Sequence, residues 1–150
     1  MLFKDIVSVI FDENDLKGLD NSDIKIDLYE WILEYGTYTK KFLYLDYRGE
    51  EDYEIVNYIL DYELKYDIEL ASQEELEQLG KFQYELVPGK IREVNKIISS
   101  KGYGLFSYPT TGDYYALFIA ALENKIKLVQ IQLLKNKSIP IKERYIQFYD

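Results

Sequence analysis

The sequence predicts an α+β fold, with a small, largely antiparallel sheet of three to five strands covered by about five helices. Residues 102–122 form the densest apolar and aromatic run, and a Pro-Thr-Thr-Gly-Asp turn breaks it once, which is typical of two adjacent strands. Upstream of this run, apolar residues recur at helical spacing in several segments. Helices therefore precede most of the strands, an order that favours an α+β fold.

The strand expected at 114–121 is apolar on both faces. One face carries Tyr115, Leu117 and Ile119, and the other carries Tyr114, Ala116 and Phe118. Such a strand is expected in the middle of a sheet that is covered on both sides. Two arrangements stay open at this point. Helices could cover one face, giving a single pair of layers, or both faces, giving an α/β/α sandwich.

The first half of the chain is expected to be mainly helical. In order, the predicted elements are a helix over 2–11, an acidic connector over 12–20, a helix from 21 or 22 to about 35, a strand over 42–46 and a helix from about 50 to 66. Asn21 or Ser22 suits the start of the second helix, and Gly36 suits its end. The third helix has a buried stripe made of Ile55, Val56, Ile59 and Leu60. Glu63 falls on the same side, so either this helix ends earlier or the carboxylate is paired.

The second half of the chain is expected to contain most of the strands. The predicted elements are helices that start near 72 and 88, strands over 103–108, 114–121 and 126–134, and a last segment over 141–148. Ser72 and Glu75 have the spacing of a capping box, and Pro88 suits a first helical turn. Gly102 ends the second of these helices. The last segment is expected to be an edge strand or a docked tail, and Pro140 suits an edge.

Composition bounds the chemistry of the chain. A length of 150 residues indicates one domain over 1–150, and the chain has neither cysteine nor histidine. Thiolate chemistry, disulfides and histidine-based acid–base catalysis are therefore excluded. No apolar run of about 18 residues and no secretory leader is found, which predicts a soluble, cytoplasmic protein that does not bind a membrane.

The net charge of −9 is unevenly distributed. Residues 1–86 carry 22 acidic and 8 basic side chains, whereas residues 87–150 carry 5 acidic and 10 basic side chains. The acidic part should repel nucleic acid and attract a basic protein. The basic side chains of the last third are scattered and lack the clustered pattern of a nucleic-acid-binding module. The charge could also serve solubility alone.

A search for catalytic patterns identifies only one carboxylate pair. Phosphate-binding loops of the G-x-x-x-x-G-K-[ST] and G-x-G-x-x-G types are absent. Asp46 ends a predicted strand and Asp113 lies in the central turn, so both could meet at one end of the sheet with Arg48. Such a pair could hold a hard cation or act in acid–base catalysis. Alternatively, Asp113 stabilises its turn and Asp46 pairs with Arg48. We therefore predict no catalytic residue, no metal site and no cofactor.

Two predicted helical faces are candidates for binding a partner. The residues proposed for partner binding are Asp23, Asp27, Glu30 and Glu34 on one helix and Glu54, Tyr58, Asp61 and Tyr62 on the next. Residues three or four positions apart share one helical face, so the carboxylates form acidic lines. Tyrosine supplies contact area with a polar tip, as it does at interface hot spots. The alternative is that these faces are simply solvated.

Two stretches resemble a family of small bacterial domains of unknown function. They are residues 42–51 (FLYLDYRGEE) and 101–120 (KGYGLFSYPTTGDYYALFIA). In that family a strand that ends in an acidic-aromatic-basic turn is followed by a helix and later by a Gly-Tyr … Asp-Tyr-Tyr-Ala hairpin. The resemblance covers about a third of the chain, and it implies the fold more than a function. In general character the chain is also similar to immunity proteins of bacterial toxin systems, which are often small, cytosolic, acidic and non-catalytic.

We therefore expect a non-enzymatic, protein-binding inhibitor, most simply an immunity protein that neutralises a basic bacterial toxin such as a nuclease. One alternative is a scaffold or oligomerisation domain that forms a homodimer through the edge near 141–148. The other is a carboxylate- or metal-dependent enzyme that acts on a small molecule through Asp46 and Asp113.

Overall fold

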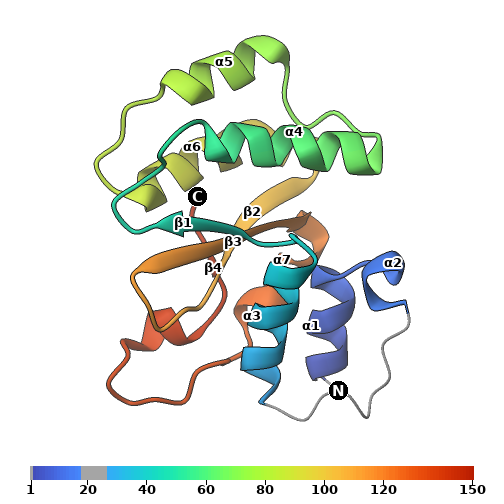
Figure 1. Ribbon diagram of the computed structural model, residues 1–150, viewed down its shortest axis with the longest axis vertical. Helices are drawn as coiled ribbons and strands as arrows, with labels where there is room; N and C mark the ends of the chain where they lie inside the picture. Colours follow the sequence, from blue (N-terminus) through green and yellow to red (C-terminus); the bar gives the residue numbers. More distant parts are fainter. Residues whose placement is uncertain (1, 18–26) are drawn as a thin grey trace.

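The computed structural model describes residues 2–17 and 27–150 (Figure 1). Within these residues the fold is α+β, as predicted, and an open antiparallel sheet has the strand order β1-β3-β2-β4. The strands are β1 (Leu43–Asp46), β2 (Tyr103–Tyr108), β3 (Tyr114–Ala121) and β4 (Gln147–Phe148). The helices are α1 (Leu2–Ile10), α2 (Glu13–Leu16), α3 (Leu28–Tyr38), α4 (Glu54–Tyr66), α5 (Gln73–Lys81), α6 (Val87–Ile98) and α7 (Lys125–Val129).

Helices cover both faces of the sheet, so the α/β/α sandwich is the arrangement formed. Helices α4, α5 and α6 lie on one side, and α1, α3 and α7 lie on the other (Figure 1). Strand β3 pairs with β1 and with β2, which confirms its predicted place in mid-sheet. Its alternating side chains enter two separate cores: Leu117 and Ile119 pack with α4 and α6, whereas Ala116 and Phe118 pack with α1 and α3.

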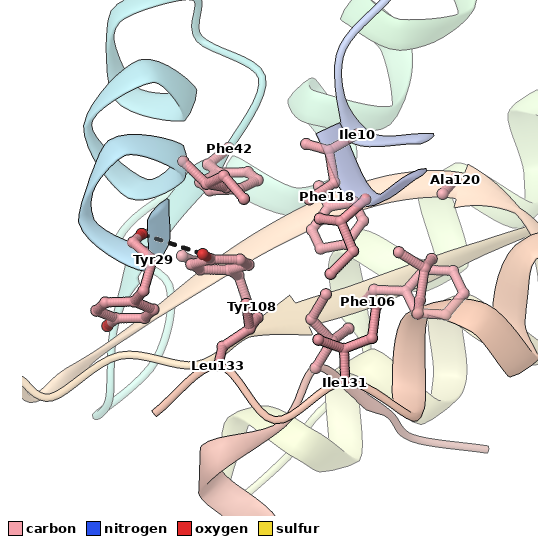
Figure 2. Packing of buried hydrophobic residues seen from close by; sticks show 14 of the residues in the cluster. Ile10, Tyr29, Phe42, Phe106, Tyr108, Phe118, Ala120, Ile131 and Leu133 are labelled. Carbon is pink, nitrogen blue, oxygen red and sulfur yellow. Dashed lines mark hydrogen bonds between the residues drawn. The ribbon is translucent and has the colours of Figure 1, made fainter. Parts of the chain in front are cut away.

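The core on the α1–α3 side is aromatic (Figure 2). Phe42 lies between the rings of Tyr108 and Phe118, with centroids 5.2 and 5.5 Å away. The Tyr29 and Tyr108 rings stack with centroids 5.5 Å apart, and the Tyr108 hydroxyl donates to the Tyr29 carbonyl oxygen at 3.1 Å. Aromatic pairs in this range stabilise a fold by about 0.5–1.5 kcal/mol each beyond the area that they bury. This core anchors α3 to the sheet.

Gly36 has a different role from the predicted one. Helix α3 does not stop there but continues to Tyr38. A Cβ atom at position 36 would lie 2.4 Å from the Phe42 ring, so the glycine is required for close packing of that ring on the helix. The predicted start of this helix, at Asn21 or Ser22, lies outside the described residues. The 12–20 connector contains the short helix α2, and Asp12 and Asp15 form a capping box at the start of this helix.

The predicted strand over 126–134 is wrong. Residues Lys125–Val129 form α7, with Leu128 buried and Ile126 exposed, and an irregular segment follows. Ile131 and Leu133 are buried as the alternation required. Within the described residues this segment forms a single β-bridge, between Gln132 and Tyr145, and the amides of Leu133 and Leu134 donate to the Arg144 carbonyl oxygen. Leu134 is buried as well, so the burial is not strictly alternating, and no strand forms over 126–134.

The last segment forms a short edge. A 3-10 turn over Ile141–Arg144 precedes the two-residue strand β4, which pairs with β2. Beside it, the buried side chain of Asn95 on α6 accepts from the Leu105 amide at 2.7 Å and donates to the carbonyl oxygens of Leu105 and Tyr149. This amide satisfies backbone groups of β2 and holds the C-terminal residues against the sheet. An edge of two residues offers little backbone for the homodimer that the alternative of an oligomerisation domain requires.

We expect the substitution of tyrosine by phenylalanine to affect the free energy of unfolding differently at Tyr29 and at Tyr108, although the two rings stack on each other. The Tyr29 hydroxyl is buried without a hydrogen-bond partner among the described residues. Tyr29→Phe should therefore leave the free energy of unfolding unchanged or raise it by up to about 1 kcal/mol, because an unsatisfied buried hydroxyl is removed. Tyr108→Phe should lower it by about 1 kcal/mol, because a hydrogen bond is lost. Urea unfolding measures both; equal destabilisation by the two variants would contradict this account.

Candidate functional site

A groove of about 930 Å³ runs between α4 and α5. Its apolar lining includes Val56, Leu60 and Leu76, and the Tyr53 ring lies against Gly80. Two large apolar side chains that line it are exposed to solvent, Tyr53 by 56% and Leu60 by 44%. Leu64, one helical turn after Leu60 on α4, is 84% exposed. Leu60 was predicted to be buried, and its place in the groove corrects that prediction. Clustered exposed apolar side chains rimmed by polar ones mark interaction surfaces.

The geometry of the groove depends on a buried ion pair at one end. The carboxylate of Glu50 lies 3.1 Å from the ammonium of Lys90 on α6, and both side chains are less than a tenth exposed. Glu50 also accepts from the Ile55 amide in the first turn of α4 and from the Tyr84 hydroxyl. Lys90 donates to the carbonyl oxygen of Leu79 near the end of α5. One ion pair therefore joins α4, α5 and α6.

A second internal carboxylate fixes the other end. Glu63 of α4 accepts from the amides of Leu70 and Ala71, at 2.6 and 3.2 Å, in the loop before α5. Of the two predicted outcomes for Glu63, pairing is the one observed. The Ser72–Glu75 capping box then starts α5, as predicted. The α4–α5 pair is thus held at both ends by carboxylates that face inward.

The remaining carboxylates of this region face solvent. Residues 50–81 carry eleven acidic side chains and two lysines, of which Lys81 lines the groove. In the part of the chain that the structure describes, the ones without an ion pair include Glu51, Asp52, Glu54, Asp61, Asp67, Glu69, Glu74 and Glu77. Of these, Glu69 and Glu77 line the groove together with the internal Glu63. We call the groove and these outer carboxylates the α4–α5 surface.

Of the predicted partner-binding residues on α4, the two tyrosines lie inward. The Tyr58 hydroxyl donates to the Lys41 carbonyl oxygen, and its burial raises the pKa of this phenol. The Tyr62 ring packs 4.5 Å from the Tyr66 ring, and burial, with smaller contributions from Tyr103 and Asp12, raises the pKa of Tyr62 to about 12. These two side chains pack the interior and are poorly placed for a partner. Asp61 is exposed and Glu54 is partly exposed.

The acidic line predicted on α3 is only partly described. Asp27, Glu30 and Glu34 are exposed, and Asp23 lies outside the described residues. Glu34 borders a shallow hollow of about 470 Å³ with Leu33 and Tyr44. This face also exposes Tyr38, which is 83% exposed and lies one helical turn after Glu34. Its hollow is smaller than the groove between α4 and α5, and so we take the α4–α5 surface as the better docking surface.

Two early carboxylates, which no prediction placed, are used internally. Asp12 and Asp15 of the α2 cap lie 4.0 and 3.5 Å from the buried ammonium of Lys41, and both also pair with Lys65. The Tyr66 hydroxyl donates to Asp12 at 2.7 Å. Burial lowers the pKa of Lys41, against the opposing effect of Asp15. This network joins the N-terminal segment to α4.

The carboxylates of Asp46 and Asp113 come to the same end of the sheet, since β1 pairs with β3 and the Tyr47 amide donates to the Asp113 carbonyl oxygen. The Arg48 side chain donates to both oxygens of Asp46, at 2.9 and 3.1 Å. Hydrogen bonds from the Arg48 side chain and from the Arg48 backbone amide lower the pKa of Asp46 to about 2. Asp113 lines a hollow that Asp46 does not line. Their geometry matches the alternative in which Asp46 pairs with Arg48. Among the described residues no group of three or more acidic side chains could hold a metal ion.

Sequence reasoning missed several residues of the α4–α5 surface. It did not identify Leu64, Glu69 or Glu77, and it placed Leu60 in the core. A usable signal was present, because Leu60 and Leu64 are one helical turn apart and Leu64 lies outside the predicted buried stripe. Glu69 and Glu77 reach the groove only because α5 folds back along α4, which local spacing does not reveal.

Comparisons of the chain with protein-family models, with curated proteins and with solved structures return no match. The resemblance of residues 42–51 and 101–120 to a family of bacterial domains therefore stays a prediction. No helix within the described residues is long and apolar enough to cross a membrane.

We expect Lys90→Met to lower the free energy of unfolding by about 3–5 kcal/mol, because it leaves the Glu50 carboxylate buried and uncompensated. Lys90→Met combined with Glu50→Gln should recover part of this loss. As a control, Lys96→Met breaks an exposed pair with Glu93 and should cost less than about 1 kcal/mol. Chemical denaturation measures all three; a Lys90 variant no worse than the Lys96 variant would show that the buried pair is dispensable.

The free energy of unfolding should also decrease at low pH, because the Asp12 carboxylate becomes protonated. Burial alone would raise the pKa of Asp12, but hydrogen bonds from Tyr66 and from the Asp15 amide, with the charges of Lys41 and Lys65, lower it to about 2. Its pKa in an unfolded chain is about 3.9. The stabilisation is therefore present above about pH 4 and is lost as the pH falls toward 2.

The Asp12 side chain is 28% exposed, so solvent screening limits this contribution to about 1 kcal/mol. Urea unfolding of the parent and of Asp12→Asn should show a difference in stability at pH 6 that narrows by about that amount at pH 2.5. A difference that stays constant between the two pH values would contradict the lowered pKa.

Proposed function

We propose that the protein is a non-catalytic inhibitor that binds a basic protein through the α4–α5 surface, most simply an immunity protein that neutralises a basic toxin such as a nuclease. The observation that supports this proposal is the combination, in one place, of an apolar groove of about 930 Å³ and unpaired carboxylates around it. Apolar area contributes affinity, and the surrounding charge selects the partner and speeds its approach.

The distribution of charge also supports a basic partner. The inward carboxylates Glu50 and Glu63 are satisfied by internal donors, so they hold the helices and leave the outer ones to act on a partner. A field of one sign with few counterions raises association rates toward about 10⁸–10⁹ M⁻¹s⁻¹ at low salt. The outer carboxylates would occupy the place of phosphate groups in a basic cleft.

The test is an association-rate measurement with basic toxin domains encoded beside the gene. Glu69→Lys combined with Glu77→Lys should slow association about tenfold at 50 mM NaCl, and raising the salt to 300 mM should slow the parent protein strongly. The matched control is Glu30→Lys combined with Glu34→Lys, which makes the same change in net charge on the competing α3 face. Bio-layer interferometry gives both rates.

Three outcomes would contradict the proposal: no binding partner among these domains, an association rate that salt does not change, or slowing by the α3 variant alone. The apolar part of the surface has its own test. Leu60→Ser combined with Leu64→Ser should raise the dissociation rate. Ile126→Ser removes an apolar side chain that is 70% exposed on α7, and it should leave the dissociation rate unchanged.

A further inference from the structure

A second hollow, of about 360 Å³, opens where the β2–β3 turn meets the C-terminal segment. Residues 107–115 form one wall and residues 138–149 form much of the other. Figure 1 shows these two segments at the end of the sheet, away from α5. The tyrosines that line the hollow are Tyr47, Tyr108, Tyr114, Tyr115, Tyr145 and Tyr149. Its volume is at the lower end of the range of about 300–1,000 Å³ that is usual for ligand pockets.

The charged side chains of this hollow are all acidic. Asp113 and Glu143 line it, and no lysine or arginine does. Neither carboxylate forms an ion pair with any residue in 2–17 or 27–150. The Arg144 guanidinium, next in sequence, is used elsewhere, because it donates to the carbonyl oxygens of Ile139 and Lys137. The hollow therefore presents uncompensated negative charge beside aromatic rings.

The aromatic and acidic groups lie close together. Burial is the main cause of the raised pKa values of Tyr115 and Tyr149, and the negative charge of Glu143 contributes to both. The Tyr149 ring already contacts one cation, since the guanidinium carbon of Arg92 lies 5.7 Å from its centroid. A tyrosine face attracts a cation by about 0.5–2 kcal/mol, depending on how far the cation is desolvated.

The walls of the hollow are held in place before any ligand arrives. The Thr110 hydroxyl donates to the Tyr114 carbonyl oxygen at 2.7 Å and closes the turn. The side-chain Nε2 of Gln147 donates to the Lys142 carbonyl oxygen at 2.7 Å, and the Arg144 side chain donates to the Ile139 carbonyl oxygen in the preceding loop. A preformed site loses little conformational entropy on binding.

We propose that this hollow binds the guanidinium group of an arginine side chain from the partner protein. Guanidinium stacks on aromatic rings and presents a planar fork of donors to carboxylates, so Tyr115, Tyr149 and Glu143 match it better than they match an ammonium group. The identity of the partner rests on the proposed function. The hollow itself is separate from the α4–α5 surface, and small probes can test it without a partner.

The test is an NMR titration of the ¹⁵N-labelled protein with N-acetyl-arginine amide. Chemical shifts should move for residues around 107–115 and 138–149, and the dissociation constant should be at least fivefold lower than for N-acetyl-citrulline amide. Citrulline has the same shape but a neutral urea group, so the difference reports the charge. Equal affinities for the two probes, or shift changes confined to other parts of the molecule, would overturn the proposal.

Variants locate the site. Asp113→Asn and Glu143→Gln, both at exposed positions, should each weaken binding of the arginine probe about threefold or more, and together about tenfold. Glu123→Gln, another exposed carboxylate, is the control and should leave the affinity unchanged. If all three single variants weakened binding of the arginine probe equally, only the net charge of the protein would matter, and the proposed site would be wrong.

A last comparison, between capped and free arginine, distinguishes an arginine within a polypeptide from the free amino acid as the source of the guanidinium group. Binding of the capped arginine more tightly than free arginine supports an arginine within a polypeptide. Tighter binding of free arginine would overturn that assignment in favour of the free amino acid. Because these titrations use no toxin domain, they can fail while the α4–α5 surface still binds its partner.

Discussion

The buried ion pair between Glu50 and Lys90 is the contact on which the α4–α5 surface depends. Burying two charges is costly, and here the cost is offset by their short separation and by hydrogen bonds to the Ile55 amide, the Tyr84 hydroxyl and the Leu79 carbonyl oxygen. These contacts come from four different segments of the chain. A hydrophobic replacement could stabilise the fold equally well, but it would not fix the first turn of α4 to the last turn of α5. The pair therefore specifies a geometry more than it adds stability.

This constraint explains how a very acidic chain can stay compact and still present charge. Glu50, Glu63, Asp12 and Asp15 are each satisfied by internal donors or lysines, so they act as structural carboxylates. The outer carboxylates of α4 and α5 form no ion pair among the described residues, and their mutual repulsion is opposed by the contacts of Glu50 and Glu63 at the two ends of the helix pair. The proposed binding function depends on this difference between inner and outer carboxylates, because a basic partner would reduce the repulsion among the outer ones. The tyrosine-lined hollow at the end of the sheet likewise presents carboxylates without an ion pair, Asp113 and Glu143, but in a smaller volume.

Much of the fold could be predicted from local signals, and the failures have physical reasons. The central hairpin and the capping box at Ser72 follow from spacing alone, because each is decided within a few residues. For Glu63 the spacing left two alternatives open, and the observed pairing depends on the loop before α5. The segment 126–134 was mispredicted because its alternation reflects burial under the sheet, whereas α7 forms by local helical contacts and the short strand β4 takes the edge of β2. The candidate site was harder still. Tyr58 and Tyr62 looked like surface residues by helical angle, but the turn before β1 and the α2 network cover them, and the groove exists only after α5 folds back.

The most direct test of the account is the distance between α4 and α5 in solution, which this cysteine-free chain makes straightforward to measure. Spin labels at Asp61→Cys and Glu74→Cys should give one narrow distance distribution in the parent and a broad one after Lys90→Met. A reference pair at Glu34→Cys and Glu123→Cys should stay narrow in both, which separates loss of the clamp from general unfolding. An α4–α5 distribution that is unchanged by Lys90→Met would show that the buried pair does not hold the binding surface.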